Sequence, residues 1–401
     1  MWVDRLFNQL FELSVSLPLT PGPSPQGEGR IKALSLGRGL GEGGGPTQEP
    51  KMKKLTIQPA WLFQADEQHS FDRTMFTLLR GIHSTGKLTE AAREAHISYR
   101  HAWNLLNRWE AFFGLPLVSM RKGQGTRLSA LGETLLWAEQ RLQARLGPQT
   151  ESMASELNME LQQLLEGAHP VLRVYASHGY AVALLPTFRD QLELNLQYCS
   201  PTDALTALNR GDCDIAGFHL PTDQSFGQHI FNTYKHLLDA DQHCVIRFIT
   251  RQQGLMMREQ MDTPISSLTD LARPGLRFIN RQKDSGTRAL LNLLLKKANI
   301  DGQDIQGFER EEYTHTAIAA YIASNMADAG FGVEAAARQF GLGFLPLAKE
   351  HYLMICRKDR LSDEKLQRFL GLLKSPAFIE AVNALPGYQP NRCGEVEVLP
   401  F

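Results

Sequence analysis

The chain has 401 residues, of which 43% are hydrophobic and 21% are charged, and its formal net charge is −1 at pH 7. This length supports two or three domains with hydrophobic cores, and the composition is that of an ordinary globular protein. No apolar stretch is long enough to span a bilayer, and the five cysteines form no CxxC pair, which argues against a membrane protein, a zinc site and a disulfide framework.

The charges are unevenly distributed along the chain. Residues 52–131 carry 11 Lys and Arg against 6 Asp and Glu, whereas residues 132–401 carry 26 against 32. A basic segment is therefore joined to an acidic one, and only the basic segment suits a polyanionic partner.

Residues 1–51 are expected to have no fold. Gly and Pro occupy 15 of the 33 positions from 18 to 50, and such a segment buries too little apolar surface to offset its ordering entropy. We interpret it as an over-extended translation start, with Met52 as the true first residue. A genuine flexible tail is the alternative, and N-terminal sequencing of the native protein separates the two. The first residues lack the basic region, the clean apolar run and the small-residue cleavage site of a secretory signal, so we expect a cytoplasmic protein.

Residues 70–113 are predicted to form three helices. Apolar residues recur at helical spacing from Phe71 to Leu79, and the Ala-rich stretch LTEAAREA at 88–95 is typical of a short helix. Ser98 then precedes a longer helix that has an apolar stripe, and its hydroxyl is suited to cap that helix. A short helix, a tight turn and a longer helix with a polar outer face predict a helix-turn-helix.

A β-hairpin and a long helix should follow. LPLVSM and GTRLS flank a Gly-Gln-Gly turn, which predicts the hairpin of a winged helix-turn-helix. We therefore assign residues 52–131 to a DNA-binding domain and residues 132–168 to a linker or dimerisation helix. Gly147 and Pro148 should kink or break that helix.

The exposed positions of the second helix and of the hairpin carry the residue types that bond base edges and phosphates. The predicted DNA-contacting residues are Ser98, Tyr99, Arg100, His101, Asn104, Arg108, Arg121, Lys122, Gln124 and Arg127. An ordinary three-helix bundle with a solvated charged face is the alternative. The helix-turn-helix pattern, the wing and the local positive charge together favour DNA.

The segment LTEAAREAHISYRHAWNLLNRWEAFFGLPLV resembles the winged-helix domain of the molybdate-responsive regulator ModE, which is akin to the LysR type. The resemblance covers about residues 70–145. It implies a homodimer that binds a palindromic operator in double-stranded DNA, with one recognition helix in each half-site. It does not continue into the small β-barrel domains that bind molybdate in that family.

From Val171 onward, strand-like and helix-like segments alternate, which predicts parallel α/β layers in a domain that spans residues 169–401. The expected strands include LRVYAS, LNLQYC, DIAGF, CVIRFIT, LRFIN, DAGFG, GLGFLPL and YLMICR. Three polar segments stand at expected helix starts, namely 177–179, 281–288 and 313–316. Each alone is explained by a helix cap, but two of them follow strands directly, where ligands of open α/β sheets bind. We therefore expect a shared site for an oxyanion.

GLRFINRQKDSGTRALL, DIAGFHL and ADAGFGVEAAA resemble the substrate-binding domain of molybdate- and tungstate-type periplasmic binding proteins, over about residues 170–375. The resemblance implies a type II fold, in which crossing strands join two α/β lobes and the ligand lies between them. The ligand-binding residues predicted from the three segments and from this resemblance are Ser177, His178, Gly179, His219, Arg281, Ser285, Gly286, Thr287, Arg288 and Thr316. A satisfied core histidine is the alternative for His219. Asp284 stands where that family usually has Gly, and a carboxylate suits a small oxyanion poorly.

The expected architecture is α/β overall: a mostly α winged helix-turn-helix, a linker helix and a two-lobed domain. The expected function is a one-component transcription regulator that binds operator DNA and senses a small anion, with molybdate or tungstate favoured, and that has no cofactor, metal site or membrane partner. A solute-binding protein or a molybdenum-cofactor-related protein that uses the same site is the alternative. Because no nucleophile–base pair, Walker loop or metal-ligand spacing is found, catalytic residues are not expected.

Overall fold

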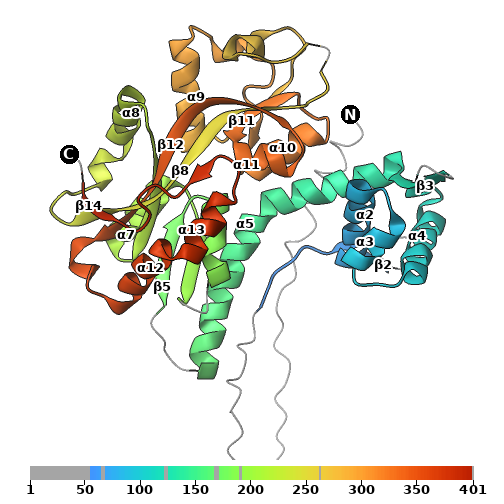
Figure 1. Ribbon diagram of the computed structural model, residues 1–401, viewed down its shortest axis with the longest axis horizontal. Coiled ribbons are helices and arrows are strands. Elements are labelled where there is room, and N and C mark those ends of the chain that lie inside the picture. The colour runs from blue at the N-terminus through green and yellow to red at the C-terminus, as the bar shows by residue number, and fades with distance from the viewer. Residues whose placement is uncertain are drawn as a thin grey trace, which may run out of the picture. The chain divides into compact units, whose positions relative to one another are not determined.

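The computed structural model describes residues 55–64, 68–121, 125–166, 171–188, 192–261 and 263–399. The tail expected at 1–51 lies outside these residues. Along the described chain, a small helical module is followed by one long helix and then by a larger α/β domain (Figure 1). This order confirms the fold class expected from the sequence.

The first elements form the helix-turn-helix module. Their bounds are β1 (Trp61–Gln64), β2 (Gln68–Phe71), α2 (Arg73–Thr85), α3 (Leu88–Glu94), α4 (Tyr99–Phe113), β3 (Val118–Arg121) and β4 (Gly125–Leu128). The three predicted helices and the wing hairpin β3–β4 are present. The antiparallel pair β1–β2 was not expected, and it contributes Phe63 and Phe71, whose rings both contact Trp109 on α4. An aromatic cluster thus extends the core of the module.

Close backbone approaches hold the module together. A Cβ atom at Gly81 on α2 would lie only 2.7 Å from the Cα atom of Ala91 on α3, so the two helices touch where glycine stands. The amide of Thr126 on β4 donates to the Gly86 carbonyl, 2.8 Å away, at the C-terminus of α2. The wing is therefore fastened to the turn between α2 and α3.

The larger domain contains the remaining elements. Its helices and strands are β5 (Leu172–Ala176), α6 (Tyr180–Leu184), β6 (Leu194–Tyr198), α7 (Pro201–Arg210), β7 (Ile215–Pro221), α8 (Gln224–Tyr234), β8 (His243–Met257), β9 (Phe278–Arg281), α9 (Gly286–Lys297), β10 (Glu311–Glu312), α10 (His315–Ala323), β11 (Ala329–Val333), α11 (Glu334–Gln339), β12 (Gly343–Arg357), α12 (Glu364–Lys374), α13 (Pro376–Asn383), β13 (Tyr388–Gln389) and β14 (Val396–Val398). Short 3₁₀ helices lie at Leu185–Phe188, Lys235–Leu237, Leu268–Ala272, Gly302–Asp304 and Lys358–Arg360.

One sheet passes through this domain in the order β10-β9-β11-β8-β12-β7-β5-β6. The strands β10, β9 and β11 are parallel to one another, and so are β7, β5 and β6. Between these two halves run β8 and β12, which pair with each other and with both halves in antiparallel fashion (Figure 1). Two α/β lobes joined by two crossing strands are the architecture that the sequence predicted.

The two crossing strands are longer than expected. The sequence predicted a strand that ends with CVIRFIT and two separate late strands, whereas β8 and β12 each run for 15 residues. The predicted strand stops before the polar run Arg-Gln-Gln at 251–253, but this run continues β8, and Arg251 and Gln253 are buried by their neighbours. Polar residues remain inside a sheet when other side chains satisfy their hydrogen bonds.

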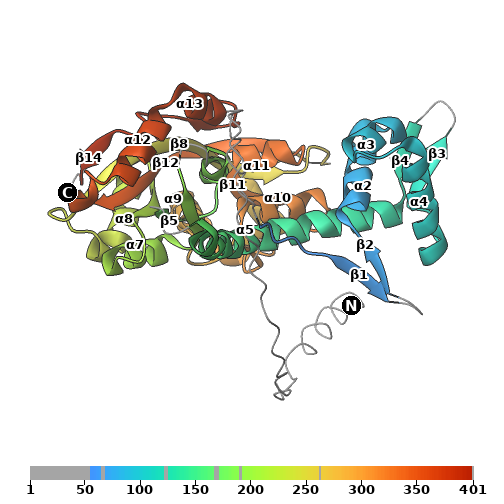
Figure 2. The same ribbon diagram turned by 90° about the horizontal axis from the view of Figure 1, so that it is seen from below.

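Helices cover both faces of the sheet. One apolar cluster contains residues from β5, β8, α10, α11, α12 and α13, and the other contains residues from α7, α8 and α9 together with the opposite face of the strands. Figure 2 shows α12 and α13 on one side of the sheet and α7 and α8 on the other. The core is therefore divided into two layers by the sheet.

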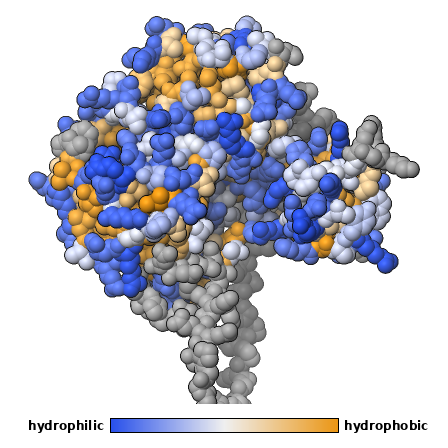
Figure 3. All heavy atoms as spheres, in the orientation of Figure 1, coloured by the Kyte–Doolittle hydropathy of each residue, from blue (hydrophilic) through white to orange (hydrophobic). Residues whose placement is uncertain are grey.

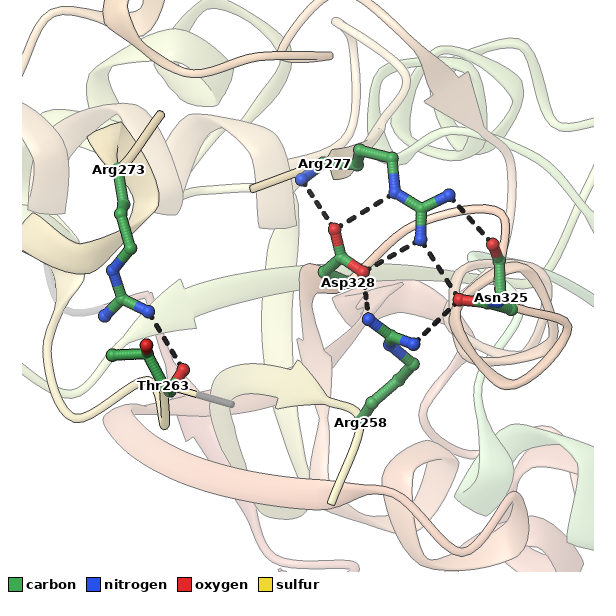
Figure 4. Close-up of polar contacts among 6 residues, drawn as sticks. All are labelled: Arg258, Thr263, Arg273, Arg277, Asn325 and Asp328. Atoms are coloured by element: carbon green, nitrogen blue, oxygen red, sulfur yellow. Dashed lines mark hydrogen bonds and ion pairs between the residues drawn. The ribbon is translucent and has the colours of Figure 1, made fainter. Parts of the chain in front are cut away.

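In each lobe, an aspartate and an arginine link the starts of two parallel strands by hydrogen bonds. Asp328, just before β11, accepts hydrogen bonds from the amide, Nε and Nη2 of Arg277, just before β9, and from Arg258 (Figure 4). Asp214, just before β7, accepts from the amide, Nε and Nη2 of Arg173 on β5 in the same way. Both links lie at the amino ends of the strands, so the opposite ends remain available for a site.

The long helix α5 (Ala130–Glu166) passes through Gly147 and Pro148 without interruption, so the predicted break is wrong, but the helix bends along its course, as a kink requires (Figure 1). Pro148 has no N–H group, which leaves the Ala144 carbonyl without its helical donor. The hydroxyl of Thr314, the N-cap of α10, donates to that carbonyl at 2.9 Å. A side chain of the α/β domain thus replaces the missing hydrogen bond of the helix.

Further along, α5 protects an edge of the sheet. The amides of Leu196 and Tyr198 on the edge strand β6 donate to the hydroxyls of Ser155 and Ser152, at 3.1 and 2.9 Å. Edge strands with unpaired amides invite association with other chains. Here the helix satisfies two of these amides and is attached to the first lobe.

Candidate functional site

The turn of the helix-turn-helix is set by local backbone chemistry. His96 lies between α3 and α4 and has a left-handed backbone, with a φ of 55°. Ser98 caps α4, because its hydroxyl accepts a hydrogen bond from the His101 amide at 3.2 Å. The predicted DNA contact Ser98 therefore already has a structural role, which orients the first turn of α4.

One exposed surface of α4, here called the recognition face, contains half of the predicted DNA-contacting residues. Its residues are Tyr99, Arg100, His101, Asn104 and Arg108, all of them exposed. On the opposite side, Ala102, Leu106 and Trp109 are buried in the module. The sequence did not identify Trp103, which is also exposed and stands next to Asn104.

The wing supplies a second polar surface. Arg127 on β4 is exposed, and Arg121 ends β3. Lys122 and Gln124, the other predicted wing residues, lie outside the described residues. Hydrophilic and intermediate residues predominate on the face of the module seen in Figure 3. The recognition face and the wing together have the donors that a phosphate backbone requires.

In the larger domain, the crossing strands carry a set of buried polar side chains near the middle of the sheet. Arg251 on β8 is paired with Glu350 on β12, and its Nε donates to Glu350 Oε1. Gln253 Nε2 donates to the same oxygen at 2.7 Å. All three side chains are at most 2% exposed. This ion pair is therefore held in a region from which water is excluded.

Histidine and tyrosine side chains surround this ion pair. Nδ1 of His219 on β7 lies 3.4 Å from Arg251 Nη2 and 3.9 Å from Glu350 Oε1. The ring of His219 packs against the ring of Tyr352 on β12, with 4.0 Å between centroids. The Tyr352 hydroxyl donates to the Ser177 carbonyl at 3.0 Å, which links this region to the end of β5.

The N-terminus of α9 contacts the same region. Ser285 caps α9 by accepting from the Arg288 amide, and Thr287 Oγ1 accepts from Gln253 Nε2 at 3.3 Å. A Cβ atom at Gly286 would lie 3.8 Å from His219 Cδ2. The first turn of this helix therefore faces the buried side chains.

Two further histidines and a second arginine complete the site, here called the buried polar cluster. Its charged or titratable members and their amide partner are His178, His219, Arg251, Gln253, Arg281, His315 and Glu350. Burial, and then the charges of Arg281 and Arg251, lower the pKa of His178 to about 4 and keep the pKa of His315 well below its usual value. All three histidines are therefore neutral at pH 7.

The arginines keep their charge. Burial, and then the neighbouring Arg251, lower the pKa of Arg281 to about 10, which still leaves the guanidinium protonated at pH 7. The pKa of Arg251 is raised, because Glu350 and nearby tyrosines outweigh the effect of its burial. Two buried cations thus face a single buried carboxylate of the cluster.

Some polar atoms of the cluster have no hydrogen-bond partner among the described residues. Arg251 Nη1 and His315 Nδ1 are two such atoms. A Cβ atom at Gly179 would lie 3.3 Å from Arg251 Nη1, and one at Gly332 would lie 3.1 Å from His315 Nδ1. The backbone of a glycine therefore packs closely against each of the two unpaired atoms, where a larger residue would not fit without a shift.

The structure separates the predicted ligand-binding residues. His178, Gly179, His219, Arg281, Ser285, Gly286 and Thr287 come together at the cluster. Ser177 donates its hydroxyl to the Cys199 carbonyl, and Thr316 contacts the Tyr180 hydroxyl. Arg288 lies apart, because its guanidinium stacks on Phe308 at 4.0 Å and donates to the Phe308 carbonyl.

Four buried residues at this site were not predicted. They are Arg251, Gln253, Glu350 and Tyr352. His315 belongs to the polar segment 313–316 that the sequence indicated, although it was not named as a ligand-binding residue, and the polar run at 251–253 directly after an apolar strand was the available signal for Arg251 and Gln253. Glu350 and Tyr352 reach the cluster only through the pairing of β12 with β8.

Two kinds of feature are absent from the described residues. No helix among them is long and apolar enough to cross a membrane. Within the same part of the chain, no group of three or more His, Cys, Asp or Glu side chains is arranged to hold a metal ion. The three histidines of the cluster therefore do not form a ligand set there.

Two segments of the chain match known protein families. Residues 75–133 match the family described as bacterial regulatory helix-turn-helix protein, lysR family. Residues 185–374 match the PBP superfamily domain. The second match includes the crossing strands and all of the buried polar cluster except His178.

Individual relatives are more distant. The uncharacterized protein YvgK of Bacillus subtilis is 30% identical over 200 residues, which cover 50% of this chain and 64% of that protein. The molybdenum-pterin-binding protein MopB of Rhodobacter capsulatus is 30% identical over 108 residues, which cover 26% of this chain and 39% of that protein. The solved structure of an OxyR mutant from Corynebacterium glutamicum is 14% identical, with a TM-score of 0.39 and coverage of 77% of this chain and 92% of that chain. The two family matches thus place a lysR-family helix-turn-helix, at residues 75–133, and a PBP superfamily domain, at residues 185–374, on one chain.

Proposed function

We propose that this protein is a one-component transcription regulator, which binds operator DNA through the recognition face and the wing and senses a small anion at the buried polar cluster. The observation that supports it best is the presence, on one chain, of a lysR-family helix-turn-helix with an exposed polar face and a PBP-superfamily domain that buries two arginines. Operator DNA places such a protein in the cytoplasm.

A dimer is the form that we propose binds DNA. The second half of α5 exposes apolar side chains at helical spacing, namely Met153, Leu157, Leu161 and Leu164. Such a stripe on a helix whose other side is packed on β6 suits a second copy of the same helix. Two recognition helices related by a two-fold axis would then bind a palindromic operator.

Molybdate or tungstate is the effector that we favour. The buried arginines, the first turn of α9 and the Thr287 hydroxyl supply donors for a small oxyanion. The similarity to a protein named for binding molybdenum-pterin points in the same direction. The exposed Asp284 acts on Arg281 only through its charge, so the carboxylate in the family's glycine position does not occupy the cluster.

The contacts of α5 suggest how occupancy of the cluster reaches the DNA-binding module. Thr314 donates to the Ala144 carbonyl, and Glu312 is paired with Arg145 at 3.0 Å. His315, a member of the cluster, follows Thr314 directly. A ligand that shifts the start of α10 therefore moves two contacts of the helix that leads into the module, and its different affinity for the two arrangements would change the population that binds DNA.

Selection of DNA by the full chain tests the proposal. Double-stranded fragments from a random library should be enriched for one palindromic sequence. In a thermal-shift assay with molybdate, tungstate, sulfate and phosphate, an anion at a hundred times its Kd should stabilise the protein by about 2.7 kcal/mol. If no sequence is enriched, the result contradicts the proposed regulator, and a solute-binding or molybdenum-cofactor-related role remains.

Arg100→Ala should weaken binding to the selected operator by about 1–3 kcal/mol, because Arg100 is exposed in the first turn of α4 and we assign it to base readout. Fluorescence anisotropy with a labelled operator measures the change. Arg368→Ala, on the surface helix α12, is the matched control and should bind like the wild type. Unchanged affinity of the Arg100 variant would remove this residue from the base-reading set.

Thr314→Val should reduce the effect of the anion on operator affinity, since valine keeps the shape of threonine but cannot donate to the Ala144 carbonyl. A coupling free energy of about 1–3 kcal/mol is typical of such regulators, and most of it should be lost. The operator Kd is measured with and without the anion. Ser375→Ala removes the cap of α13, which is not linked to α5, and should leave the coupling intact; full coupling in the Thr314 variant would contradict the proposed route.

A further inference from the structure

The charges of the buried polar cluster do not balance. Arg251 and Arg281 are cations, Glu350 is the buried carboxylate and is paired with Arg251, and the three histidines are neutral, so the buried groups carry one positive charge that no buried carboxylate balances; Asp284, which also acts on Arg281, is exposed. Titratable groups on the surrounding elements also face it. They are His178 and Tyr180 after β5, Tyr198 on β6, His219 on β7, Tyr234 on α8, Arg251 on β8, Arg281 and the exposed Asp284 around β9, His315 on α10, Glu350 and Tyr352 on β12, and Tyr388 on β13.

This imbalance distinguishes between anions of different charge. A monoanion would neutralise the cluster, whereas a dianion would leave one negative charge in a region that excludes water. An uncompensated buried charge is costly, and proteins avoid it by taking up or releasing a proton. The neutral imidazoles are the groups of the cluster that can accept a proton near neutral pH.

His315 is the best placed of the three. Its Nδ1 atom has no hydrogen-bond partner among the described residues and lies beside Gly332. Arg281, Arg251, His219 and His178 all act electrostatically on its ring and contribute to its lowered pKa. A fully ionised oxyanion has no proton to donate, so the imidazole must supply the proton of any hydrogen bond between them.

We propose that the buried polar cluster binds a divalent oxyanion together with one proton, which His315 accepts from solvent and directs at the bound anion. No bond of the anion is broken, and the complex of two arginines, one carboxylate, one imidazolium and one dianion is neutral. The inference rests on the anionic effector of the proposed function, and it adds the charge class of that effector and a binding residue.

The direction of the pKa shifts agrees with this charge balance. In the free protein, burial and the two arginines hold the pKa of His315 well below its usual value. A bound dianion acts in the opposite direction and raises that pKa. At pH values between the pKa of His315 in the free protein and its pKa in the occupied protein, binding of the dianion takes up one proton. The affinity should therefore fall by about tenfold for each unit by which pH rises in this range, and it should level off above the pKa of the occupied state.

Tungstate and perrhenate provide a matched pair of probes, because both are tetrahedral oxyanions and they differ by one charge. Calorimetric titration of the full chain at pH 7, in buffers of different ionisation enthalpy, should give uptake of about one proton with tungstate and almost none with perrhenate. Tungstate affinity should fall from pH 6 to pH 8 while perrhenate affinity stays constant. Tungstate binding without proton uptake would overturn the inference and leave the anionic effector intact.

His315→Gln should abolish the proton uptake with tungstate and lower tungstate affinity at pH 6 by about tenfold or more, with little effect on perrhenate. His236→Gln, at an exposed position, is the control and should behave like the wild type. Proton uptake that persists in the His315 variant would overturn the assignment to this residue. If the variant does not fold, the wild-type titrations still decide the question. Absence of binding by either anion would overturn both the inference and the anionic effector, whereas DNA selection tests the regulator separately.

Discussion

Glu350→Gln should lower the free energy of unfolding by about 3–5 kcal/mol, because it removes the buried carboxylate that is paired with Arg251 and leaves that guanidinium uncompensated. Gln253 also loses the charged acceptor of its amide group. Urea denaturation monitored by circular dichroism measures the change. A tungstate concentration that saturates the site should recover part of the loss, since the anion supplies negative charge to the same region.

Glu309→Gln is the matched control for this variant. Glu309 is paired with Lys283 and Arg288, but its side chain is 69% exposed, and exposed pairs contribute little to stability. The free energy of unfolding should stay within about 0.5 kcal/mol of the wild type. A loss at Glu350 no larger than that at Glu309 would contradict the conclusion that the Arg251–Glu350 pair is buried and mutually dependent.

Arg281→Ala should weaken binding of the anion by about 2–5 kcal/mol, which is a loss of thirtyfold or more. Arg281 is buried at the C-terminal end of β9, directly before the loop that leads into α9, and it is one of the two cations of the buried polar cluster. Titration with tungstate measures the affinity. Operator binding in the absence of anion should be unchanged, because the recognition face is on another domain.

Arg288→Ala separates the two arginines of this segment. The sequence assigned both to the ligand, but in the structure Arg288 is stacked on Phe308 and hydrogen-bonded to its carbonyl. We therefore expect this variant to be less stable and to keep its affinity for tungstate. If Arg288→Ala lost the anion and Arg281→Ala kept it, the site would have to be placed on the Phe308 side of α9.

The sequence predicted the helix-turn-helix well because its determinants are local. A capping serine, small residues on the support helix and an apolar stripe on α4 each act within a few residues of one another. The hairpin β1–β2 was missed, since its strands are four residues long and are stabilised by rings of α4 that lie about forty residues away. Short strands of this kind depend on packing partners that are distant in the chain.

The helix around Pro148 is another feature that depends on a residue distant in the chain. Proline in a helical pattern predicts a break, and in isolation the helix would lose the hydrogen bond to Ala144. The Thr314 hydroxyl replaces it from a position more than 160 residues further along the chain. No local pattern around Pro148 could indicate a donor supplied by another domain.

The sequence by itself determined the order and the type of the domains, the recognition face, and the two polar segments at the ends of β5 and β9. These features depend on helix caps, amphipathic periodicity and the alternation of strands and helices, which are set by residues close together in the chain. Only the tertiary structure decided which polar residues share the buried polar cluster. Strand pairing brings Glu350 opposite Arg251 across 99 positions of sequence and turns Arg288 toward Phe308. Burial by these distant segments is also what gives the arginines and histidines of the cluster their charge states, since the free energy of a charge depends on the solvent that the surrounding fold excludes.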